Sequence, residues 1–192
     1  MIAIIKYNAG NATSVANAVK KLGYSCVITD DPQIIQSAEK VIFPGVGEAS
    51  SAMKYLKSTN LDELIIGLEQ PVLGICLGMQ LMCSWSEEGN TVGLNIFSCK
   101  VNRFPPLDIV PQMGWNQLLN TIGVLFDEFP DNGDVYFVHS YYADLCEFTI
   151  AEGDYILPFS AALQKDNFYG TQFHPEKSGQ LGQIILNNFL AL

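Results

Sequence analysis

An apolar strand that runs directly into a glycine-flanked cysteine is the feature that most limits how this chain can fold. Residues 72–80 read Val-Leu-Gly-Ile-Cys-Leu-Gly-Met-Gln, and a helical pattern continues to Met82. Gly-x-Cys-x-Gly between a strand and a helix is typical of a sharp turn in which side chains at Gly74 and Gly78 would collide with neighbouring chain. The pattern therefore predicts an α/β sheet in which one strand presents Cys76 at the start of a helix.

Cys76 is a candidate nucleophile because of that position. The start of a helix offers free backbone N–H groups and the positive end of the helix dipole, which stabilise a thiolate and can stabilise an oxyanion. The alternative is that Cys76 is a small buried hydrophobic residue, as most free cysteines are. The flanking glycines favour the nucleophile.

The chain has two histidines that could serve such a nucleophile as its base. His174 follows a strand-like run and lies in Phe-His-Pro-Glu, where Pro175 stiffens the turn so that His174 and Glu176 can project to the same side. His139 has no acid two or three residues further on, and we interpret it as a structural hydrogen-bonding residue. His174 is therefore the better candidate.

The first half of the chain alternates apolar runs with helical patterns, which predicts a parallel sheet covered on both faces. The expected strands are Ile2–Lys6, Tyr24–Thr29, Lys40–Phe43 and Val72–Ile75. The expected helices cover 15–22 and 49–56, with another that starts at Leu61 behind an Asn60/Glu63 capping box. Short β-like runs over 93–112 and 135–172 predict an antiparallel or mixed extension of the sheet, and 178–192 a closing helix. One domain over residues 1–192 is expected.

Composition argues against several classes of function. The chain carries 20 acidic and 10 basic residues, a net charge of -10, and its only arginine is Arg103. Since nucleic-acid binding needs clustered Lys and Arg, we expect no nucleic-acid partner. No stretch approaches the ~20 apolar residues of a membrane span. Without a secretory pattern, and with five scattered cysteines and no CxxC pair, we expect a cytoplasmic protein with reduced thiols and no metal site.

Two motifs, residues 74–80 and Phe-His-Pro-Glu at 173–176, resemble those of the triad (class I) glutamine amidotransferases. Members of that family hydrolyse glutamine to glutamate and ammonia on a flavodoxin-like three-layer sandwich, without a cofactor. The resemblance implies that Cys76 is the nucleophile, His174 the general base and acid, and Glu176 the carboxylate that orients the imidazole.

Four more segments are similar to one branch of this family, the glutaminase subunits of imidazole glycerol phosphate synthase. They are residues 44–47, 110–116, 137–142 and 174–179, and the similarity spans essentially the whole chain. It implies an oxyanion hole at Leu77 and, after a peptide flip, at Val46 and Gly47. It also implies glutamine contacts at Gln80, Glu88, Ser140 and Tyr141, and partner contacts at Asn11 and Trp115.

The partner that this branch implies is a (β/α)8 barrel synthase subunit, joined in a heterodimer. The barrel takes ammonia through its core and makes imidazole glycerol phosphate and an aminoimidazole carboxamide ribotide in histidine biosynthesis.

Some residues depart from the branch and keep alternatives open. Lys6 to Asn11 lack the usual small polar residue before a Tyr-Gly pair, and Gln112 stands where His is common. Val46, in a segment that matches the branch, differs from the middle Gly of many relatives in other pathways. A paralogue that supplies ammonia to another synthase, for instance for a surface sugar, is one alternative. A stand-alone cysteine hydrolase such as a peptidase fits Gln80 and Glu88 poorly. A non-catalytic scaffold would not need an intact cysteine, histidine and glutamate.

Overall fold

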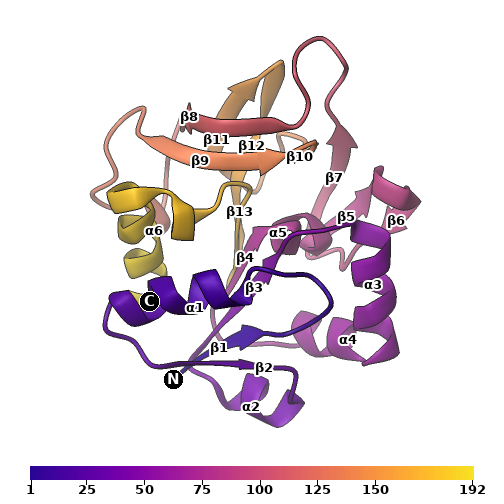
Figure 1. Cartoon of the computed structure of the whole chain (residues 1–192), viewed down its shortest axis with the longest axis vertical. Coiled ribbons are helices and arrows are strands. Elements are labelled where there is room, and N and C mark those ends of the chain that lie inside the picture. Colours follow the sequence, from indigo (N-terminus) through magenta and orange to yellow (C-terminus); the bar gives the residue numbers. More distant parts are fainter.

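An eleven-stranded sheet runs through the computed structural model, which describes all of residues 1–192 (Figure 1). The strands of the protein are β1 (Ile2–Ile5), β2 (Cys26–Thr29), β3 (Lys40–Gly45), β4 (Val72–Cys76), β5 (Cys83–Ser86), β6 (Thr91–Val92), β7 (Phe97–Arg103), β8 (Gln112–Gln117), β9 (Asp134–His139), β10 (Tyr141–Ala143), β11 (Thr149–Tyr155), β12 (Leu157–Lys165) and β13 (Phe168–Thr171). The order in the sheet is β2-β1-β3-β4-β13-β12-β10-β7-β5-β6, with β11 paired to β12.

The sheet has a parallel half and a mainly antiparallel half. Strands β2, β1, β3, β4 and β13 are parallel, in the order of flavodoxin-like folds. The strands beyond β13 pair antiparallel, except for the parallel pair β5–β7. The predicted α/β fold, a mostly parallel central sheet with an antiparallel extension, is confirmed. A separate ribbon of β8 and β9 lies across the end of the sheet where β13 finishes (Figure 1).

Helices cover both faces of the sheet. They are α1 (Ala12–Lys21), α2 (Pro32–Ser37), α3 (Ala49–Ser58), α4 (Leu61–Ile66), α5 (Leu77–Met82) and α6 (Gly179–Ala191), with 3-10 turns η1 (Glu88–Asn90), η2 (Val124–Phe126) and η3 (Pro175–Lys177). Helices α1 and α6 pack into one apolar cluster, and α2 to α5 pack into a second cluster on the other face. The molecule is therefore a three-layer sandwich. No helix combines the length and apolar character needed to cross a membrane.

The helix ends differ from the sequence prediction in two places. The Asn60/Glu63 capping box is wrong, because Asn60 adopts a left-handed conformation (φ 56°) and its side chain makes no capping hydrogen bond. The short helix α2 lies outside the helices that the sequence predicts. The Asp31 carboxylate accepts from the N–H of Gln33, and Pro32 occupies the first helical turn, where a missing N–H costs nothing.

Candidate active site

The candidate nucleophile sits at a strained turn between β4 and α5. Cys76 has φ 53° and ψ −108°, a conformation that non-glycine residues rarely adopt outside functional sites. A Cβ at Gly78 would lie 1.8 Å from the carbonyl oxygen of Phe43, and one at Gly74 would lie 2.4 Å from the Cε of Met82. Both glycines are therefore required by close packing against β3 and α5.

The residues of the site follow three neighbouring parallel strands, which end at the same edge of the sheet. In the register of β3 and β4, Gly45 pairs with Cys76, and in that of β13 and β4, Thr171 pairs with Ile75. The segment after β3 therefore begins beside the cysteine, and the segment after β13 carries His174 over the same edge. Carboxyl ends of parallel strands are the usual place for ligands in such sheets.

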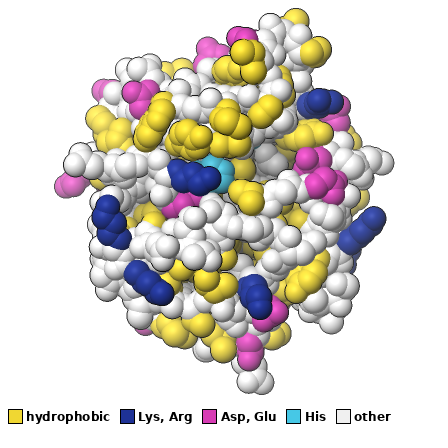
Figure 2. All heavy atoms as spheres, in the orientation of Figure 1, with side chains coloured by type: hydrophobic (Ala, Val, Ile, Leu, Met, Phe, Trp, Pro, Cys, Tyr) yellow, Lys and Arg dark blue, Asp and Glu magenta, His cyan; other side chains and the backbone are white.

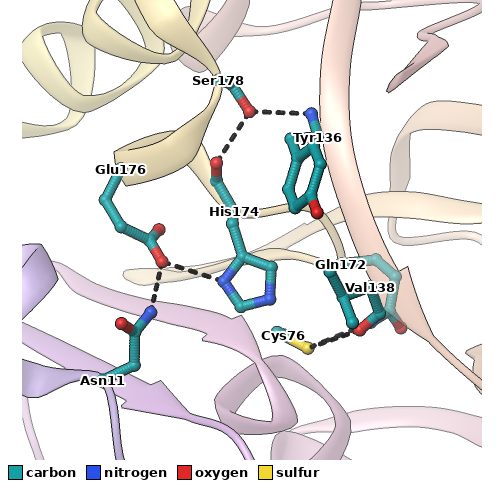
Figure 3. Close-up of polar contacts among 8 residues, drawn as sticks. All are labelled: Asn11, Cys76, Tyr136, Val138, Gln172, His174, Glu176 and Ser178. Atoms are coloured by element: carbon teal, nitrogen blue, oxygen red, sulfur yellow. Dashed lines mark hydrogen bonds and ion pairs between the residues drawn. The ribbon is translucent and has the colours of Figure 1, made fainter. Parts of the chain in front are cut away.

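His174 and Glu176 face each other as the Pro175 turn suggested (Figure 3). His174 Nδ1 lies 2.9 Å from Glu176 Oε1, and the side chain of His174 is 1% exposed. The backbone of His174 is held by the β8–β9 ribbon and by α6, since its N–H donates to the Tyr136 carbonyl (2.9 Å) and its own carbonyl accepts from Ser178 Oγ (2.7 Å). The imidazole is therefore fixed in orientation, with its other nitrogen toward Cys76 (Figure 3).

Charge at the site favours a protonated imidazole. Burial lowers the pKa of His174, but hydrogen bonding to Cys76 and Glu176 and the charges of both groups outweigh burial and raise it to about 9. The thiol lies 3.8 Å from the Val138 carbonyl oxygen and 3.6 Å from Gln172 Nε2. An imidazolium next to a thiolate is the arrangement of an activated cysteine nucleophile.

A cavity of about 300 Å³ opens above the cysteine. Its wall contains most of the residues singled out in the sequence: Val46, Gly47, Cys76, Leu77, Gln80, Glu88, Ser140, Tyr141 and His174. Glu176 lies behind the imidazole and does not line the cavity. No group of His, Cys, Asp and Glu side chains is placed to hold a metal ion.

Comparison with known proteins agrees with this geometry. The family model "Glutamine amidotransferase class-I" matches residues 3–192. The chain belongs to the class-I glutamine amidotransferase family. It is 61% identical to the imidazole glycerol phosphate synthase subunit HisH of Bacteroides thetaiotaomicron, over 100% of this chain and 99% of that protein. It is 49% identical to the HisH subunit of Haemophilus influenzae, over 98% and 96% of the two chains.

Solved structures show the same fold at much lower identity. A glutamine amidotransferase from Thermotoga maritima superposes with a TM-score of 0.65 at 20% identity, over 99% of this chain and 82% of that one. PurLQS from the same organism gives a TM-score of 0.73 at 14% identity, over 99% and 97%. The resemblance seen in the sequence, to class-I amidotransferases and among them to HisH subunits, is confirmed.

Two of the residues expected to bind glutamine in this amidotransferase, Gln80 and Glu88, make hydrogen bonds to other parts of the protein. Gln80 is 6% exposed, and its amide nitrogen donates to the Tyr141 carbonyl and to Gln172 Oε1, both at 2.9 Å. The Glu88 carboxylate accepts from the N–H of Ala49 at 2.8 Å, and burial raises the pKa of Glu88. These contacts hold both side chains in place on the cavity wall.

The two expected interface residues lie in different surroundings. Trp115 on β8 is 58% exposed and packs one edge against Tyr136. Asn11, in a left-handed turn (φ 84°) before α1, donates its side-chain amide to Glu176 Oε1. Asn11 therefore touches the expected catalytic carboxylate, a contact that the sequence did not suggest.

His139 is a buried residue of the wall, 5% exposed, as its structural interpretation suggested. Burial lowers its pKa to about 4, so the ring is neutral at pH 7. Its Nδ1 lies 2.8 Å from the Tyr141 carbonyl and must donate there, while Nε2 lies 2.7 Å from Gln112 Oε1. Because Nε2 of the neutral ring can only accept, the Gln112 amide must turn its nitrogen to this position. Gln112, where the branch commonly has His, thus supports His139.

Gln172 is the residue that sequence reasoning missed. It is fully buried and touches the cysteine sulfur, yet it looked like an ordinary member of a strand. Its only sequence signal is its place two residues before His174, at the end of a strand-like run.

Proposed function

We propose that this chain is the glutaminase subunit of an imidazole glycerol phosphate synthase and hydrolyses L-glutamine to glutamate and ammonia. The observation that carries the proposal is the alignment of Cys76 and His174 at the wall of a cavity large enough for one amino acid, with Glu176 behind the imidazole. The full-length similarity to HisH subunits supports the choice of synthase.

In the proposed reaction the Cys76 thiolate attacks the carboxamide carbon of glutamine. The backbone N–H of Leu77, at the start of α5, and N–H groups of the Val46–Gly47 segment hold the oxyanion, each worth roughly 3 kcal/mol of barrier. Gly47 already has φ 132°, which leaves the neighbouring peptide free to turn at little cost.

His174 then moves the protons. As an imidazolium it protonates the departing ammonia, and as a neutral base it activates the water that releases glutamate from the thioester. Glu176 keeps the proton on Nδ1 and stabilises the charged ring, so that Nε2 faces the reacting atoms. Glu88 supplies a negative charge for the ammonium group of glutamine, and Gln80, Ser140 and Tyr141 complete the substrate wall.

The proposed partner is a HisF-like (β/α)8 barrel subunit in a cytoplasmic heterodimer. Ammonia released into bulk water would be protonated, so a partner must cover the cavity and carry it to the synthase site, where imidazole glycerol phosphate and the carboxamide ribotide form. Exposed apolar side chains gather beside the cavity, at Ile109, Met113 and Trp115. In Figure 2, hydrophobic side chains are grouped above the buried histidine that is partly visible near the middle of this face.

Glutaminase assays with and without the barrel test the proposal. Cys76→Ala should abolish hydrolysis while keeping the fold, and Cys26→Ala, on β2 far from the cavity, should leave it intact. If the oxyanion segment needs the loaded barrel to turn, addition of barrel and nucleotide ligand should raise the rate at least about 10²-fold, the value of one donor. Hydrolysis by Cys76→Ala would overturn the nucleophile, and full activity of the isolated chain would overturn the coupled synthase.

A further inference from the structure

A buried chain of amide groups connects the cavity wall to the cysteine sulfur. Gln80 Nε2 donates to the Tyr141 carbonyl and to Gln172 Oε1, and Gln172 Nε2 donates to Cys76 Sγ. In Figure 3, Gln172 and Val138 lie on one side of the sulfur and the His174 imidazole on another. Three groups therefore surround the sulfur, and only the His174 imidazole belongs to the expected triad.

A backbone carbonyl sets the direction of the hydrogen bonds in this series of amide groups. A carbonyl oxygen can only accept, so Gln80 must turn its amide nitrogen toward Tyr141. The second hydrogen of that nitrogen points to Gln172, which must therefore present its oxygen there and its nitrogen to the sulfur. The Tyr141 carbonyl is itself held by a second donor, His139 Nδ1 at 2.8 Å. Reversal of the Gln172 amide would place two donors face to face, so the N–H toward Cys76 is fixed.

An N–H donor beside sulfur favours the thiolate, because hydrogen bonds to the charged form stabilise that form. The neutral thiol has a different neighbour, since an S–H can point to the Val138 carbonyl oxygen at 3.8 Å. The Gln172 N–H thus stabilises the thiolate of Cys76, and the Val138 carbonyl accepts from its thiol. Gln172 has no exposed surface, so water cannot replace its N–H.

We propose that Gln172 is a positioning residue for the nucleophile, whose amide holds the Cys76 thiolate toward the cavity and connects it to Gln80 on the substrate wall. The inference deepens the proposed function, since it takes Cys76 to be the nucleophile. Gln172 touches the sulfur and not the substrate, and it acts through Cys76.

Two variants of Gln172 separate positioning from simple packing. Gln172→Met keeps the length and burial of the side chain but removes the N–H. Gln172→Glu is nearly isosteric and replaces the donor with an acceptor. Gln164→Met is the matched control, because Gln164 is a glutamine of the neighbouring strand β12 whose amide nitrogen reaches only the Tyr169 hydroxyl, at 3.4 Å.

Alkylation of Cys76 by iodoacetamide, followed by peptide mapping from pH 5 to 10, measures the thiolate without glutamine. The pH midpoint of labelling should rise by about one unit in Gln172→Met and further in Gln172→Glu, as expected for loss of a hydrogen bond to a charged group. His174 and the buried Tyr7 hydroxyl also sense the Cys76 charge, but both are present in every variant. Glutaminase kcat should fall about tenfold with little change in KM.

The outcomes distinguish this inference from the function it rests on. A wild-type chain that shows no glutaminase activity even with the loaded barrel, but with the shifted labelling in the Gln172 variants, would overturn the function and support the positioning role. Wild-type labelling midpoint and kcat in either folded variant would overturn the positioning role. If Gln172→Met does not fold, as judged by circular dichroism, Gln172→Glu alone decides.

Discussion

The pH dependence of stability should reveal His139 as a histidine that is kept neutral by burial. In the folded protein its pKa is lowered to about 4, whereas in the unfolded chain it returns to its ordinary value near 6.5. At a pH between these two pKa values, His139 is protonated in the unfolded chain and neutral in the folded protein. The free energy of unfolding should therefore fall as the pH drops from 6.5 to 4, by about 1.4 kcal/mol per unit and ~3 kcal/mol in total.

The measurement is urea unfolding at pH values from 4.5 to 6.5, for the wild type and His139→Gln. Carboxylates that titrate in the same range are common to both proteins, so the difference between the two slopes isolates His139. His139→Gln should be less stable at pH 7 and should show a flatter slope. Parallel slopes would refute the argument that this ring is buried in its neutral form.

His174→Gln provides the matched control, because the pKa of His174 is shifted in the opposite direction to that of His139. The pKa of His174 is raised to about 9, so its contribution to stability is complete below pH 6.5 and is lost as the pH rises toward 9. His174→Gln should keep most of the acid slope, because burial of His139 is its largest cause and the His174 charge only a smaller one, and it should remove the alkaline slope.

Three further changes test packing, the carboxylate and the docking surface. Gly78→Ala should lower the free energy of unfolding by about 3 kcal/mol or more, measured by urea unfolding, whereas Gly67→Ala should be almost neutral because its Cβ would meet nothing closer than 3.5 Å. Asn11→Ala should lower kcat about tenfold by removing a donor from Glu176, and Asn11→Asp should cost more, since it adds a like charge; equal rates in a glutaminase assay would contradict this. Trp115→Ala should weaken barrel binding at least about tenfold in a calorimetric titration without lowering the melting temperature, and unchanged affinity would remove Trp115 from the interface.

Local signals explain which parts of the architecture could be predicted. The glycines around Cys76 and the apolar runs of β1 to β4 depend on contacts made near the turn or on burial on both faces, so sequence pattern is enough. The position of β13 between β4 and β12 depends on pairing between distant segments, which no local pattern encodes. Local patterns also failed at two helix starts. Asn60 fits a capping box by spacing but adopts a left-handed backbone, and Asp31-Pro32 starts a helix as well as it ends a strand.

In the candidate site too, local sequence patterns predict some residues and miss others. Cys76 and His174 with Glu176 carry recognisable spacing, because a strained turn and a proline turn each need particular residues in sequence. Gln172 and Asn11 act through contacts with residues far along the chain, and amide side chains are common at exposed and turn positions. Their roles become visible only when the distances to sulfur and carboxylate are known.

The central position of β13 also determines when, during synthesis, the candidate active site can form. Translation produces β13 after every other strand, yet the two halves of the sheet meet only through it. A chain still attached to the ribosome, with β4 complete and β13 not yet made, contains Cys76 but neither His174 nor Gln172, which follow β13 in the sequence. On the proposed mechanism, an unfinished chain should therefore release no ammonia, and glutaminase activity should begin only when β13 has entered the middle of the sheet.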